Sequence, residues 1–138
     1  MNFDVTQFDT RTASEAGVAM PILHPRTGSP MLGADGNPVT ITLLGPSSAV
    51  YKTMSRASQL RRADMSARGV KMTDEDFEAD RETMLVALTK GWNFDTMGGQ
   101  PFAFSQSNAR SFYADKRWEW VTVAAWRFIN EDGNYLPS

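Results

Sequence analysis

Two short segments in the first third of the chain have the hydrophobic pattern of strands, and the second alternates as a half-buried strand does. Residues 18–23 are mostly apolar, and residues 39–44 alternate β-branched, polar and aliphatic side chains. A strong turn sequence, Asp35-Gly36, lies between them. The pattern predicts a β-hairpin module over residues 18–45, with Pro21 at an edge because proline donates no backbone hydrogen bond.

The spacing of apolar residues then becomes helical, and capping residues mark where helices begin. A first helix is capped by Ser47 or Ser48 and ends by Gly69. A second helix begins after Thr73 and ends at Gly91. Because the turn between them is tight, the two helices are expected to form an antiparallel hairpin.

Two further helices are predicted in the C-terminal third. Ser105 caps a short helix through Ala114, and a longer helix spans about residues 115–130. The expected fold class is α+β, with a short N-terminal β-hairpin module followed by a small bundle of about four α-helices. The predicted divisions are an N-terminal arm (1–17), the β-hairpin module (18–45), a helical domain (46–131) and a C-terminal tail (132–138) that frays.

The charges of this 138-residue chain nearly balance, at a formal net charge of −2, but they are segregated along it. Residues 50–71 carry six basic side chains and one acidic, whereas residues 72–82 carry six acidic and one basic. We expect the basic and acidic helices to face each other in the hairpin. The acidic neighbour opposes contact between the basic helix and phosphates, so no nucleic-acid partner is predicted.

No group of residues predicts catalysis, cofactor binding or metal binding. The chain has no cysteine, which removes thiol nucleophiles and disulfides. His24, the single histidine, precedes a proline in a predicted turn and has no evident nucleophile or carboxylate partner. The acidic residues at 74–78 mimic the start of a calcium loop, but Ala79 and Leu85 stand where a glycine and a bidentate carboxylate are needed. A non-enzymatic protein is therefore expected.

Aromatic residues are concentrated towards the C-terminus, where ten of the fifteen lie between Trp92 and Phe128. Trp118 and Trp120 are two positions apart on a predicted helix, so they cannot both face one core. Such a spread of aromatic side chains is typical of a core that continues into an interface with another protein. The candidate partner-binding residues are Trp92, Phe94, Phe102, Phe104, Tyr113, Trp118 and Trp120.

A series of short sequences between about residues 18 and 130 follows the order of a known family pattern. They are His24-Pro25, Thr27-Gly28, Pro30, Asp35-Gly36, Pro38-Val39, Ile41, Leu44-Gly45 and Tyr51, then Lys90-Gly91-Trp92-Asn93-Phe94, Gly99, Pro101-Phe102, Phe104-Ser105, Asn108-Ala109 and Phe112-Tyr113. In this order they resemble the tail assembly chaperones of long-tailed bacteriophages. The region from Trp118 to Trp126 departs from the family pattern.

The resemblance implies a chaperone that binds the long, helical tape measure protein and keeps it soluble during tail tube assembly. It also implies the tail tube protein as a further partner. The expected location is the host cell cytoplasm, because the chain starts with polar and acidic residues and no apolar run is long enough to span a bilayer. No membrane partner is expected. A structural virion protein of the phage tail or head–tail junction is the alternative. A homo-oligomer is compatible with the sequence, which does not indicate an oligomeric state.

Overall fold

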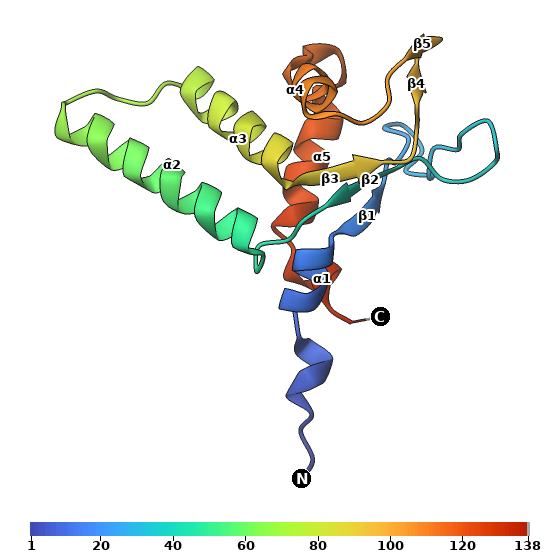
Figure 1. Ribbon diagram of the computed structural model, residues 1–138, viewed down its shortest axis with the longest axis horizontal. Coiled ribbons are helices and arrows are strands. Elements are labelled where there is room, and N and C mark those ends of the chain that lie inside the picture. Colours follow the sequence, from blue (N-terminus) through green and yellow to red (C-terminus); the bar gives the residue numbers. More distant parts are fainter. Residues whose placement is uncertain (138) are drawn as a thin grey trace.

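Three strands pair antiparallel in the order β1-β2-β3 at the centre of the computed structural model, which describes residues 1–137 (Figure 1). β1 (Val18–Pro21) and β2 (Thr40–Leu43) form the predicted hairpin, with Met20 opposite Ile41. Ile41 and Leu43 are fully buried, as the alternation along β2 predicts. The combination of helices with small sheets confirms the α+β class.

The position of β3 (Thr89–Trp92) corrects the predicted order of elements. The sequence predicts a helix up to Gly91, but the helix ends at Leu88 and the chain continues as a strand along β2. Thr89 lies opposite Leu43, which is far away in the sequence, so no local pattern reveals this pairing. The molecule is therefore not a hairpin followed by a helical bundle, because strands also lie between its helices.

A second, two-stranded sheet follows β3 in a region whose pattern predicts a loop. β4 (Thr96–Met97) pairs with β5 (Gln100–Pro101). Gly98 and Gly99 make the turn between them with φ values of 59° and 77°, which glycine adopts without the steric penalty of a side chain. This small hairpin reverses the chain between β3 and the segment that leads into α4.

The helical hairpin that the sequence predicts is present (Figure 1). α2 (Ala49–Ala67) begins after Ser48, whose hydroxyl accepts a hydrogen bond from the backbone N–H of Tyr51. α3 (Asp74–Leu88) begins after Thr73, which forms a reciprocal capping box with Asp76. Both caps satisfy backbone donors that have no partner inside the helix.

Part of the segregated charge is neutralised between these two helices. Asp80 of α3 is buried and forms ion pairs with Arg61 and Arg62 of α2. Two other carboxylates of α3 pair instead with Lys116, which follows α4 in the chain. The acidic helix thus joins the basic helix on one side and the C-terminal part of the chain on the other.

The last two helices complete the layer that covers the sheet. α4 (Gln106–Ala114) is capped by Ser105, as predicted. α5 (Glu119–Ile129) starts later than predicted, because a short 3₁₀ turn, η2 (Lys116–Trp118), precedes it. On α5, the side chains of Val121, Ala125 and Ile129 recur every four residues and are buried.

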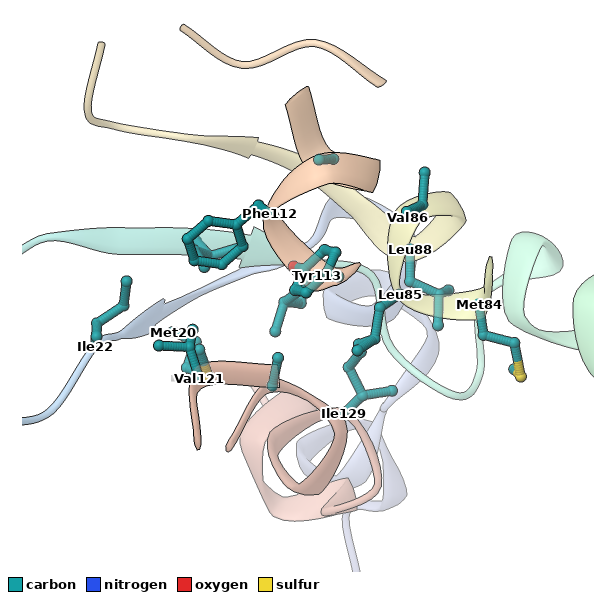
Figure 2. Close-up of a cluster of buried hydrophobic side chains, with 14 residues drawn as sticks. Met20, Ile22, Met84, Leu85, Val86, Leu88, Phe112, Tyr113, Val121 and Ile129 are labelled. Atoms are coloured by element: carbon teal, nitrogen blue, oxygen red, sulfur yellow. The ribbon is translucent and has the colours of Figure 1, made fainter. Parts of the chain in front are cut away.

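One core joins the sheet to α3, α4 and α5, and Figure 2 shows its side chains converging from these elements. Leu85 and Leu88 of α3 are fully buried within it, beside Phe112 and Tyr113 of α4. β1 contributes Met20. The strands far apart in the sequence are therefore held together by the same apolar cluster that anchors the helices.

Both ends of the chain contain short helical turns. The arm contains a 3₁₀ turn, η1 (Val5–Phe8), and a short helix, α1 (Arg11–Ala16). The prediction that the C-terminal tail frays is wrong for Tyr135, which ends the 3₁₀ turn η3 (Asp132–Tyr135) and is fully buried. Its hydroxyl donates to the carbonyl oxygens of Leu43 and Leu44 at 3.3 and 3.4 Å, so the tail is fixed to the end of β2.

Candidate partner-binding groove

A groove of about 830 Å³ opens on the surface between the long β1–β2 connection, the segment that follows β3, and the start of α5. This volume lies within the range of about 300–1,000 Å³ that is typical of ligand-binding clefts. The principal apolar side chains that line it are Met31, Leu32, Val39, Trp92, Phe94, Met97, Phe104, Trp118, Trp120 and Val121. We refer to this surface as the aromatic groove.

Trp92 is the centre of the groove's aromatic wall. Its ring stacks on Phe94 with centroids 4.9 Å apart and on Phe102 with centroids 5.5 Å apart. The ring of Phe104 meets it edge-on at 5.1 Å. The indole N–H of Trp92 donates to the carbonyl oxygen of Phe102 at 3.1 Å, so the polar atom of this side chain is satisfied while its faces contact apolar neighbours.

Asn93 joins the wall at β3 to the β1–β2 connection. Its side-chain amide N–H donates to the carbonyl oxygen of Pro38 at 2.8 Å, and its amide oxygen accepts from the backbone N–H of Thr40 at 2.9 Å. Asn93 thereby fixes the connection beside the aromatic wall. Its position directly after Trp92 places it at the end of β3, where a side chain can reach the neighbouring strand.

A further part of the groove's lining comes from the turn that leads into α5. The indole N–H of Trp118 donates to the carbonyl oxygen of Phe112 at 2.8 Å, and the guanidinium of Arg117 lies 4.6 Å from the Trp118 ring centroid. Arg117 also forms an ion pair with Asp115, and this contact lowers the pKa of the Asp115 carboxyl. Trp120, two residues further, keeps 38% of its surface exposed.

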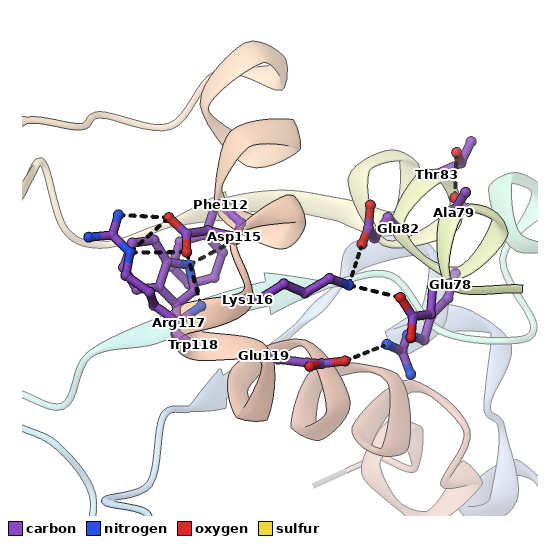
Figure 3. A network of polar contacts seen from close by, with 11 residues as sticks. Glu78, Ala79, Glu82, Thr83, Phe112, Asp115, Lys116, Arg117, Trp118 and Glu119 are labelled. Atoms are coloured by element: carbon purple, nitrogen blue, oxygen red, sulfur yellow. Dashed lines mark hydrogen bonds and ion pairs between the residues drawn. The ribbon is translucent and has the colours of Figure 1, made fainter. Parts of the chain in front are cut away.

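A network of ion pairs fixes this turn against α3, as Figure 3 shows. The ammonium of Lys116 lies 2.9 Å from a carboxylate oxygen of Glu78 and 3.5 Å from one of Glu82. Its hydrogen bond to Glu78 lowers the pKa of that carboxyl and raises the pKa of the lysine. The beginning of α5, and with it the position of Trp118, is thus held by opposite charges on α3.

The structure brings together most of the aromatic residues that the sequence singles out. Trp92, Phe94, Phe104, Trp118 and Trp120 line the aromatic groove. Phe102 lies behind them and stacks on Trp92.

Tyr113 takes a different position, because it is buried in the core beneath the groove with 2% of its surface exposed. Its hydroxyl lies 2.7 Å from that of Thr89, and burial raises the pKa of the tyrosine to about 12. Tyr113 therefore supports the groove from below and does not line it.

Sequence reasoning missed the contribution of the β1–β2 connection. Met31 and Leu32 lie in a proline- and glycine-rich stretch and are 38% and 62% exposed at the groove. Neither residue belongs to a periodic pattern, so no local signal distinguishes them from ordinary loop residues. A smaller hollow of about 360 Å³ shares Trp120 with the groove and extends the apolar surface along β1.

The charged side chains that line the aromatic groove are acidic. Asp35 comes from the β1–β2 connection, and Asp95 comes from the segment between β3 and β4. The Asp35 carboxylate accepts hydrogen bonds from the backbone and side-chain N–H groups of Asn37 at 3.0 and 3.2 Å, which lower its pKa. No lysine or arginine lines the groove in the part of the chain that the structure describes.

His24 stabilises a turn, as its sequence context predicts. Its Nδ1 accepts hydrogen bonds from the backbone N–H groups of Arg26 and Thr27 at 3.1 and 3.4 Å. Within residues 1–137, no three histidine, aspartate or glutamate side chains gather in the manner of a metal site. None of the helices described is both long enough and apolar enough to cross a membrane.

Comparison of the chain with protein-family models, with curated proteins and with solved structures finds no match.

Proposed function

We propose that this chain is a non-enzymatic tail assembly chaperone of a long-tailed bacteriophage, which binds the tape measure protein and keeps it soluble during tail tube assembly. Two observations support the proposal. The order of short sequences resembles that family, and the residues of its second half build the wall of an apolar groove that is open to solvent. The aromatic groove is the observation that carries the proposal.

The groove suits one apolar face of a helix. A helix presents apolar side chains at spacings of three and four residues, and such a stripe buries itself in grooves of this kind. Each large apolar side chain that moves from water into the groove contributes about 1.5–3 kcal/mol, part of which is offset by the cost of association. Trp120 and Leu32 are exposed at the opening and would contact the helix first.

A long helical partner would bind several copies of the chaperone along its length. Weak single contacts then add up, because binding at one site raises the local concentration at the next. A chaperone that must later be displaced by tube subunits benefits from this arrangement, since each single contact can still dissociate.

Co-expression with a tape measure protein from the same genome tests the proposal. The wild-type chain should bring the tape measure protein into the soluble fraction and co-elute with it. Trp120→Ala should weaken the complex, whereas Leu60→Ala should not, since Leu60 is 64% exposed on α2 and outside the groove. A tape measure protein that stays insoluble with the wild-type chain would refute the proposal.

The alternative, a structural virion protein, makes the opposite prediction for the finished particle. An assembly chaperone leaves before the tail is complete, so mass spectrometry of purified virions should not detect this chain. A stoichiometric amount of it in the particles would favour the structural role.

A further inference from the structure

The aromatic groove combines an apolar floor with carboxylates that lack a cationic partner. Asp35 and Asp95 enter it from two different segments of the chain. Neither carboxylate has a lysine or arginine within ion-pair distance in residues 1–137, whereas Asp115 and Glu119, at the turn into α5, each form such a pair. The groove therefore carries negative charge that its own side chains do not neutralise.

We infer that the aromatic groove selects an amphipathic helix whose apolar face is flanked by lysine or arginine side chains. This inference rests on the proposed function, because it names the charge that the bound segment of the partner must carry. Cationic flanks would lie beside Asp35 and Asp95 while the apolar face covers Trp92 and Trp120. A helix with acidic flanks would place like charges together.

The chain's own N-terminal arm does not fit this description. Phe3 and Phe8 are 73% and 55% exposed and stack on each other, but the arm also carries Asp4 and Asp9 and no basic side chain in residues 1–10. In Figure 1 the N-terminus points away from the β1–β2 connection and β4, so the arm does not reach the groove of its own chain. The arm of a second copy would bring acidic residues to an acidic groove.

The expected difference in affinity between helices with cationic and acidic flanks is small, because the two carboxylates are exposed. Pairs between exposed charges are weak and screened by salt, and two of them together change affinity by about fivefold. The apolar face supplies most of the affinity, and the charges discriminate between otherwise similar helices.

Two designed helical peptides of about 20 residues test the inference. They share one leucine and alanine face and differ in having lysine or glutamate at the flanking positions. Binding to the full chain is measured by calorimetry at about 0.05 M and about 0.5 M salt. The lysine peptide should bind about fivefold more tightly at low salt, and the difference should shrink at high salt.

Variants of the chain assign the preference to the groove. Asp35→Asn together with Asp95→Asn should abolish the difference between the two peptides. Asp74→Asn together with Glu75→Gln changes the net charge equally at the exposed start of α3 and should retain the difference. A matched loss in both double variants would mean that total charge, and not the groove, is responsible, which would overturn the inference.

Several further outcomes of the peptide experiment would overturn the inference. Equal affinity for both peptides, tighter binding of the glutamate peptide, or no binding of either overturns the inference. Self-association of the chain that the Asp35 and Asp95 variants abolish also overturns it, because the occupant would then be a second copy. These outcomes are separate from failure of the proposed function, which is measured by the solubility of the tape measure protein.

Discussion

Trp92 and Phe102 are joined by two independent contacts: their rings stack with centroids 5.5 Å apart, and the Trp92 indole N–H donates to the Phe102 carbonyl oxygen at 3.1 Å. The stacking fixes the plane of the indole ring. The hydrogen bond fixes the indole N–H against the backbone of Phe102. Together they tie β3 to the segment that leads into α4. The aromatic groove therefore has a preformed wall, which would lower the entropic cost of binding the proposed partner helix.

Removing this side chain should destabilise the whole protein. Trp92→Ala loses the contacts with Phe94, Phe102 and Phe104 and is expected to cost about 3 kcal/mol of unfolding free energy. Trp92→Phe keeps an aromatic ring but loses the hydrogen bond, and should cost about 1 kcal/mol. Urea denaturation followed by circular dichroism measures both. Equal losses in the two variants would show that the stacking does not contribute as described.

The local signals of the sequence predict the helices well, because a cap depends on residues that are close together in the chain. Ser48, Thr73 and Ser105 each accept a hydrogen bond from the backbone N–H of the third residue of the helix that follows. The strand β3 was not predictable in this way. Its residues form a strand because β2, from a distant part of the sequence, provides backbone groups to pair with. From the sequence alone, Gly91 indicates only the end of a helix.

In the groove, too, some features could be predicted from the local sequence and others depend on distant residues. The concentration of aromatic residues in the last third predicts an interface, and Trp92 and Trp120 lie in the groove. That Tyr113 turns inward could not be predicted, because it depends on Thr89, which offers a buried partner for the tyrosine hydroxyl. The role of Asn93 could not be predicted either, since its side chain donates to the backbone of Pro38, which is far away in the sequence.

Gly45 is the position where a small change should loosen the C-terminal tail. A β-carbon at this position would stand 2.6 Å from Cδ1 of Tyr135 and would also collide with Ser14 Oγ. Gly45→Ala should therefore lower the unfolding free energy by about 2 kcal/mol, measured by urea denaturation. It should also increase proteolysis of the tail, measured by limited digestion. Gly133→Ala is the control, because no described atom lies within 4 Å of its β-carbon position. An unchanged stability of Gly45→Ala would argue against the close packing of Tyr135.

Asp80 should be the most sensitive charged residue of the helical hairpin. Its buried carboxylate accepts a hydrogen bond from Ser58 and pairs with Arg61 and Arg62, so Asp80→Ala leaves these groups without their acceptor. The expected cost is about 2 kcal/mol, reduced by the exposure of the arginines. Asp64→Ala breaks an exposed pair with Arg68 and should cost less than about 0.5 kcal/mol. Chemical denaturation measures the unfolding free energy of both variants. Similar losses of unfolding free energy in the two would contradict the prediction.

Alkaline pH should destabilise the protein through its buried tyrosines. Burial raises the pKa of Tyr113 to about 12, above the value of about 10 expected in the unfolded chain, and it also raises the pKa of Tyr135. The folded state therefore retains protons that the unfolded state releases, so the stabilising contribution is complete below about pH 10 and declines as pH rises towards 12. Each such tyrosine lowers the unfolding free energy by up to about 1.4 kcal/mol per pH unit.

The variant Tyr113→Phe separates this effect from general alkaline denaturation. At about pH 8 it should be less stable than the wild type by about 1 kcal/mol, because the Tyr113 hydroxyl lies 2.7 Å from that of Thr89 and this hydrogen bond is lost. Towards about pH 11 it should lose less stability than the wild type, since one proton-releasing group is gone. The two curves should therefore converge or cross. Parallel curves from neutral to alkaline pH would show that Tyr113 does not keep its proton in the folded state.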